Sequence, residues 1–191
     1  MGNLIDILTA TVIGAVVILM IIGINFYIEN SSRDIINSNM AQTNITELGA
    51  VIEYDFYKIG YRITGNKIVT ADSTEIKFYT DMDNNGNADT LRYYIGSTSE
   101  LTATPNPNDR LLYRVYNNET PKSSNLGVVN FKLTYYDSAG SQINYGSLNS
   151  QTHRNRIRSI GVYLKVESPY PIEGVYTGAE WKKIIRPKNF N

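Results

Sequence analysis

The chain has 191 residues, in which 18 lysines and arginines balance 18 aspartates and glutamates, and it contains no cysteine. Zero net charge argues against attraction of the whole molecule to nucleic acid. The lack of cysteine excludes disulfides, thiol nucleophiles and thiolate metal sites. The length is enough for an N-terminal anchor and one packed domain of about 130 residues.

Residues 7–24 form an almost continuous apolar segment, interrupted only by small residues that include Gly14 and Gly23. A helix rises 1.5 Å per residue, so about 20 apolar residues cross the roughly 30 Å hydrocarbon core of a bilayer. No lysine or arginine precedes the segment and no small-residue cleavage site follows it, unlike in a secretory signal peptide. The sequence therefore predicts a retained membrane helix over residues 1–28.

A second helical pattern follows, in which apolar residues recur every three or four positions. The stripe consists of Ala41, Ile45, Leu48, Ile52, Phe56 and Ile59. It predicts an amphipathic stem over residues 29–62. Because no proline separates the two segments, we expect one helix from about Leu4 to about Tyr61, with an interruption near Asn30 left open. Gly60 and the turn residues 64–66 are expected to end it.

From Lys67 onward the apolar pattern changes to a period of two, with β-branched and aromatic residues between turn signals. The predicted strands are Lys67–Thr70, Glu75–Thr80, Thr90–Ile95, Leu111–Tyr116, Val128–Tyr136, Arg156–Glu167 and Trp181–Ile185. No helical pattern separates them, which indicates an antiparallel sheet. The predicted fold class is α+β, with the long helix packed on an antiparallel β-sheet domain formed by residues 63–191.

This order of elements resembles the type IV pilin-like class of filament subunits. Leu4-Ile5-Asp6-Ile7-Leu8 resembles the start of mature pilins, with Asp6 in place of their glutamate. Residues 52–61 resemble the stem end of PilW-like minor pilins and J-type pseudopilins, and residues 78–94, 129–137 and 157–164 resemble their strands. Only Met1-Gly2-Asn3 precedes Leu4, so the family's basic leader is missing from this sequence or processing is atypical.

The resemblance implies a pilin fold and a structural subunit of a type IV pilus-like extracellular filament, most similar to a minor pilin. A minor pseudopilin of a type II secretion system and a membrane-anchored extracellular binding module are the alternatives. The implied partners are other pilin-like subunits. The implied location of the chain is a bacterial inner membrane before assembly and the extracellular filament afterwards.

The resemblance also implies roles for residues of the apolar segment. Asp6 would pair with the N-terminal ammonium of an adjacent subunit and set its register. The alternative for Asp6 is an interfacial acid favoured by the helix dipole. Gly14 and Gly23 would permit close approach of helices or local melting in a filament core.

A candidate calcium loop lies between the second and third predicted strands. Oxygen ligands occupy alternate positions in Asp81, Asp83, Asn85, Asn87 and Asp89, with Gly86 at the sixth position. This is the front of an EF-hand-type loop. Position 12 is Arg92 rather than the bidentate glutamate, and an Asn-Gly hairpin turn explains the same residues. Calcium is therefore a hypothesis, and no other cofactor is expected.

Three alternating arginines, Arg154, Arg156 and Arg158, are predicted to share one strand face beside His153. They are candidates for polyanion contact, although a solvated edge strand protected by charge is the favoured explanation and we expect no nucleic-acid partner. His153 is the only histidine, and the sequence has no nucleophile-elbow, zinc-protease or phosphate-loop motif. We therefore do not expect an enzyme.

Overall fold

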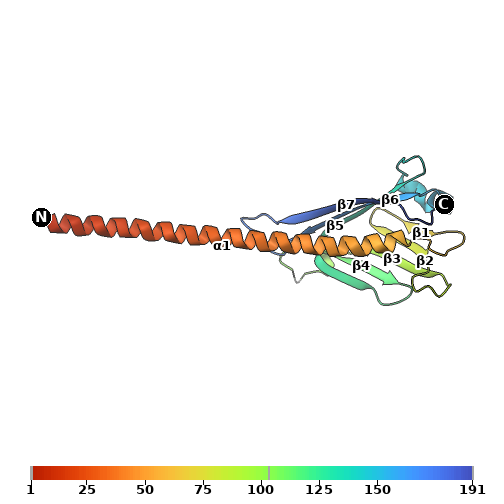
Figure 1. Ribbon diagram of the computed structural model, residues 1–191, viewed down its shortest axis with the longest axis horizontal. Coiled ribbons are helices and arrows are strands. Elements are labelled where there is room, and N and C mark those ends of the chain that lie inside the picture. Colours follow the sequence, from red (N-terminus) through yellow and green to blue (C-terminus); the bar gives the residue numbers. More distant parts are fainter. Residues whose placement is uncertain (1, 103, 191) are drawn as a thin grey trace.

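The computed structural model describes residues 2–102 and 104–190. Met1, Ala103 and Asn191, which fall within the predicted ranges 1–28 and 63–191, lie outside the described residues. One long helix, α1 (Gly2–Tyr57), precedes a seven-stranded antiparallel sheet. Figure 1 shows the first half of α1 projecting alone and its second half lying along the sheet. The predicted α+β class is confirmed.

The helix α1 runs without interruption through Asn30, so the interruption left open there is absent. It ends at Tyr57, four residues before the predicted end at Tyr61. Beyond it, Gly60 (φ +73°) and Arg62 (φ +56°) adopt left-handed conformations that turn the chain back toward the sheet. The Gly60 amide donates to the Tyr79 carbonyl at 2.8 Å, which fixes this reversal against the second strand.

The order of the strands in the sheet is their order in the sequence, because every strand pairs with its sequence neighbours. Its strands are β1 (Ile68–Ala71), β2 (Glu75–Thr80), β3 (Asp89–Ile95), β4 (Arg110–Tyr116), β5 (Lys122–Tyr136), β6 (Ser159–Glu167) and β7 (Gly178–Ile185). Short helical turns occupy the longer connections: η1 (Thr98–Glu100), η2 (Tyr145–Asn149) and α2 (Gln151–Arg154). All seven predicted strands are present, with shifted ends.

The largest shift is in β5, which begins at Lys122 rather than at the predicted Val128. Its first part pairs with β4 and its second part pairs with β6, with a register irregularity between Val128 and Asn130. Gly127 adopts φ +71°, and a Cβ there would collide with the Glu167 carbonyl oxygen. Only glycine fits this bend in the strand.

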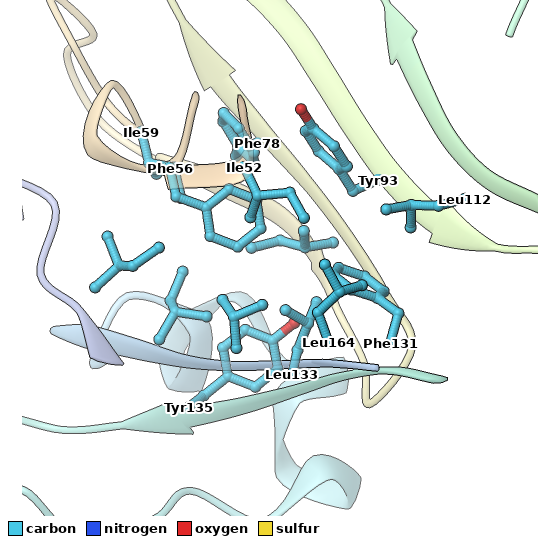
Figure 2. Packing of buried hydrophobic residues seen from close by; sticks show 14 of the residues in the cluster. Ile52, Phe56, Ile59, Phe78, Tyr93, Leu112, Phe131, Leu133, Tyr135 and Leu164 are labelled. Atoms are coloured by element: carbon cyan, nitrogen blue, oxygen red, sulfur yellow. The ribbon is translucent and has the colours of Figure 1, made fainter. Parts of the chain in front are cut away.

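The core lies between the sheet and the second half of α1. All six residues of the predicted stripe, from Ala41 to Ile59, are buried, which confirms the stripe. Figure 2 shows Ile52, Phe56 and Ile59 facing side chains of the sheet. The Phe56 ring meets Phe78 and Tyr93 edge-on, with ring centroids 5.8 Å and 5.6 Å apart. Such edge-to-face pairs are favourable arrangements of aromatic rings.

Candidate functional sites

The first half of α1 exposes its large apolar side chains. Every described residue up to Ile36 is exposed, including the aliphatic run from Leu4 to Ile28. The segment is long and apolar enough to cross a membrane, a property that signal sequences and core helices share. Exposure separates it from the core helix of a soluble domain, because a core helix covers its apolar residues within the chain. The structure is thus compatible with membrane anchoring.

Asp6, Gly14 and Gly23 all lie in this exposed half. Within residues 2–102 and 104–190, no side chain forms an ion pair with Asp6. A Cβ built on Gly14 or on Gly23 would meet no atom within 4 Å. The described part of the chain therefore forms no ion pair with Asp6 and packs nothing against Gly14 or Gly23, and their predicted roles in assembly stay predictions.

The globular body begins where the loop before β7 touches α1. The Thr177 hydroxyl donates to Asp34 at 2.8 Å, and the Asn37 amide donates to the Tyr170 carbonyl at 3.4 Å. One turn earlier, Arg33 pairs with Glu29 along the helix at 2.7 Å. These polar contacts mark the boundary between the projecting half of α1 and the half that the sheet covers.

A buried polar cluster that sequence reasoning missed joins α1 to the sheet. Asp55, on α1, accepts from Arg114 of β4 at 2.7 Å and from the hydroxyl of Tyr93 of β3. Burial and the Asp55 charge raise the pKa of Tyr93 well above its ordinary value. Burial lowers the pKa of Arg114, but the hydrogen bonds and charges of Asp55 and Tyr93 together outweigh burial, so this pKa is also raised. Removing one partner of such a buried pair leaves the other charge uncompensated.

The structure brings three of the five predicted calcium ligands, Asp81, Asp83 and Asp89, together between β2 and β3. One carboxylate oxygen each from Asp81, Asp83 and Asp89 lies within 4.8 Å of the other two. The Asn85 amide nitrogen donates to Asp83 at 2.7 Å, and the Asn85 side-chain oxygen accepts from the Asn87 backbone at 2.7 Å. The turn residue Asn84 has φ +63°, and Gly86 has φ +89°. The side-chain oxygens of Asp83 and Asn85 therefore accept hydrogen bonds from N–H groups within the same loop.

Two of these three carboxylates are withdrawn from water. Asp81 and Asp89 are buried, whereas Asp83 is exposed. Burial raises the pKa of Asp89, but hydrogen bonds from Asn117 and from the Met82 backbone outweigh it, so the pKa lies below its usual range. Asp89 is thus ionised at neutral pH. The Asp81 Oδ1 atom is buried and has no hydrogen-bond partner, a state that costs about 1–3 kcal/mol.

The prediction that Arg154, Arg156 and Arg158 share a strand face is wrong. Arg154 ends α2, and β6 begins only at Ser159. The helical turn forms because the Arg154 guanidinium binds the carbonyl oxygens of Leu148 and Asn149, at 2.7 Å and 2.9 Å.

The three guanidinium groups are held by the chain itself. Arg156 contacts Asp137 at 3.4 Å, and Arg158 donates to the carbonyl oxygens of Asn155 and Ile157 at 2.8 Å and 2.9 Å. A row of free charges for a polyanion is therefore not formed, and we do not propose polyanion binding.

Comparisons of the chain with protein-family profiles, with curated proteins and with solved structures found no match.

Proposed function

We propose that the chain is a structural subunit of a type IV pilus-like filament. Before assembly, the apolar half of α1 resides in a membrane. On assembly, the helix leaves the lipid and packs against the helices of similar subunits. The observation that carries this proposal is that the exposed apolar surface of α1 continues onto the outer face of its packed half.

That outer face carries an apolar stripe formed by Ile36, Met40, Val51 and Tyr54. Each of these side chains is between 45% and 58% exposed. At 100° per residue, the four positions lie within about 60° of one another around the helix. They lie on one side of α1, where the exposed Thr43 and Glu47 separate Ile36 and Met40 from Val51 and Tyr54, and we call these four apolar residues the outer stripe.

A membrane anchor alone does not account for the outer stripe. Residues 4–28 span about 37 Å as a helix, which already exceeds the hydrocarbon thickness of about 30 Å. Val51 and Tyr54 lie beyond that span, in the second half of α1, and Figure 1 shows this half of the helix lying along the sheet. Apolar bands on exposed helix faces are typical of surfaces that bind another helix. Packing against neighbouring stems would cover the outer stripe and the projecting half together.

Asp6 supplies the proposed register of the assembly. A carboxylate at the edge of an apolar segment is costly in lipid unless it is paired. The N-terminal amine of a neighbouring subunit is a partner of opposite charge at the same depth. Pairing would favour the axial offset at which each Asp6 meets an amine.

The outer stripe gives the first test. Val51→Glu and Tyr54→Glu place a charge at exposed positions, so the variants should fold and insert as the parent does. We expect them to be depleted at least tenfold from sheared extracellular filaments while remaining in the membrane fraction, because the contact would desolvate the charge. Immunoblots of both fractions measure this. The matched control is Ile184→Glu, at an exposed apolar position on β7.

Normal assembly of both variants would contradict the proposal. So would a parent chain that never leaves the membrane, which is the behaviour of an anchored binding module. A minor pseudopilin would use the same helix surface in a shorter assembly.

Asp6→Ala is expected to retain membrane insertion and lose filament incorporation, whereas Asp6→Glu should restore it. Restoration by glutamate separates a charge pairing from a role of side-chain size. Equal incorporation of Asp6→Ala and the parent would rule out the register role.

A further inference from the structure

We infer that the loop from Asp81 to Asp89 binds one Ca²⁺ ion and that the ion fastens the β2–β3 hairpin to the chain reversal after α1. This inference is independent of filament assembly, because it concerns a site within one chain.

The first argument is the spacing of the carboxylates. Protein oxygens bind Ca²⁺ at 2.3–2.6 Å, so two ligands of one ion are at most about 5 Å apart. The oxygen atoms of Asp81, Asp83 and Asp89 lie within 4.8 Å of one another. They can therefore contact one ion without rearrangement of the backbone.

The second argument is the buried Asp81 carboxylate. Asp81 is fully buried, and its Oδ1 atom has no hydrogen-bond partner. Its Oδ2 atom accepts from the Gly86 amide at 3.1 Å, across the loop, so the carboxylate points into the loop. Asp81 Oδ2 also pairs with Arg62 at 3.0 Å, so Oδ1 alone is left without a donor, and a bound cation would satisfy this atom.

Position 12 of the loop, where an EF-hand has a glutamate, does not supply a ligand here. Arg92 occupies that position and forms a two-pronged ion pair with Glu75 of β2, at 2.8 Å and 2.9 Å. It is therefore engaged in the sheet rather than in the loop. Asp89 is buried at the start of β3 and supplies a carboxylate from the closing side of the loop. Asn85 offers a further oxygen from the turn.

Charge favours a divalent ion. Three carboxylates face one guanidinium, that of Arg62, whose Nη1 lies 3.0 Å from Asp81 Oδ2 and 2.9 Å from the Asn84 carbonyl oxygen. The group is left with a charge of about −2. Ca²⁺ accepts an irregular set of six to eight oxygens, whereas Mg²⁺ demands an octahedral one, so the irregular loop favours Ca²⁺.

Ion binding would also stiffen the junction with the stem. The Asp81 amide donates to the Tyr61 carbonyl at 3.0 Å, and Arg62 follows directly. An ion held by Asp81 therefore couples the hairpin loop to the residues that end the helical stem.

Calorimetric titration of the full chain in detergent with CaCl₂, and separately with MgCl₂, tests the site. We expect one Ca²⁺ per chain with a Kd of about 0.1–1 mM, the range of extracellular calcium modules. Mg²⁺ should bind at least tenfold more weakly. The Tm of the body should rise by several degrees between EDTA and 10 mM CaCl₂.

The test variant is Asp83→Asn, which alters an exposed ligand and leaves the buried carboxylates in place. It should weaken Ca²⁺ binding at least tenfold. Asp72→Asn is the matched control, because Asp72 is an exposed aspartate in the neighbouring β1–β2 turn and accepts the Ser73 amide in the same way. The absence of binding heat and of a Tm shift at 10 mM CaCl₂ would overturn the inference. Equal effects of the two variants, or Mg²⁺ binding as tight as Ca²⁺ binding, would also overturn it.

Arg62→Gln tests the position of the ion in the opposite direction. Removing a positive charge about 5 Å from a dication should tighten Ca²⁺ binding about fivefold. An unchanged or weaker affinity would contradict placement of the ion beside the guanidinium.

Discussion

The two halves of α1 share one uninterrupted backbone but have opposite surroundings. The described residues from Gly2 to Ile36 are exposed and contribute nothing to the core, whereas the second half buries a residue on every turn. The glycines show the same contrast. A Cβ on Gly49 would lie 3.0 Å from the Trp181 ring, whereas a Cβ on Gly14 would meet nothing within 4 Å. The sheet of the same chain covers one half, whereas the apolar side chains of the other half are exposed.

The largest expected difference between the halves is in the response to loss of an aromatic ring. Phe56→Ala removes a fully buried ring and should lower the free energy of unfolding by about 3–5 kcal/mol. Phe26→Ala, in the exposed half, should leave the unfolding of the body unchanged. Denaturant unfolding in detergent, followed by the fluorescence of Trp181, the only tryptophan, measures both. Similar losses would show that the projecting half belongs to the folded body.

A smaller difference is expected for added bulk. Gly49→Val forces a branched side chain against Trp181 and should destabilise the body by about 2 kcal/mol. Gly14→Val should leave the Tm of the body unchanged and lower incorporation into filaments, because it blocks close approach of helices. If Gly14→Val assembled as well as the parent, a close helix contact at that position would be refuted.

The smallest effect concerns pH and the polar link between α1 and the sheet. The pKa of Tyr93 is raised by burial and by Asp55, whereas a tyrosine of the unfolded chain ionises near pH 10. Above pH 10 the unfolded state loses a proton that the folded state keeps. The contribution to stability is therefore complete below pH 10 and is lost as pH rises further, by about 1.4 kcal/mol per pH unit.

Unfolding free energies of Tyr93→Phe between pH 9 and pH 12 should show a slope that is smaller by this amount. Tyr54→Phe, at an exposed position on the outer stripe, is the control with the parental slope. An unaltered slope in Tyr93→Phe would mean that Tyr93 does not report the contact with Asp55.

Much of the fold was predictable because its signals are local. Alternation of apolar residues located all seven strands, and spacings of three and four residues located the buried stripe of α1. The first part of β5 escaped prediction because Ser123 and Ser124 show no apolar alternation and are strand residues only through pairing with β4. Arg156 and Arg158 were placed in a strand because their alternation resembles one, but they lie in the connection between α2, which ends at Arg154, and β6, which begins at Ser159.

Of the candidate sites, the one built from contiguous residues could be predicted, and the one built from distant residues could not. The ligands between Asp81 and Asp89 were recognisable because they are contiguous and their spacing reflects the geometry of one ion. The cluster of Asp55, Tyr93 and Arg114 was not, because its members are separated by 21 to 59 residues. No local pattern pairs such residues, since only the completed sheet brings β3 and β4 under the helix.

The strand order has a consequence for the order in which the chain is completed. Each strand joins its predecessor, so the sheet can grow in the direction of synthesis. The stem helix is synthesised first, but three of its contacts come from the end of the chain. Asp34 contacts Thr177, Gly49 lies against Trp181, and Glu53 pairs with Lys183. In a nascent chain, part of the stem therefore stays exposed until β7 has been synthesised. Proteases could cleave this exposed segment in incomplete chains and not in complete ones.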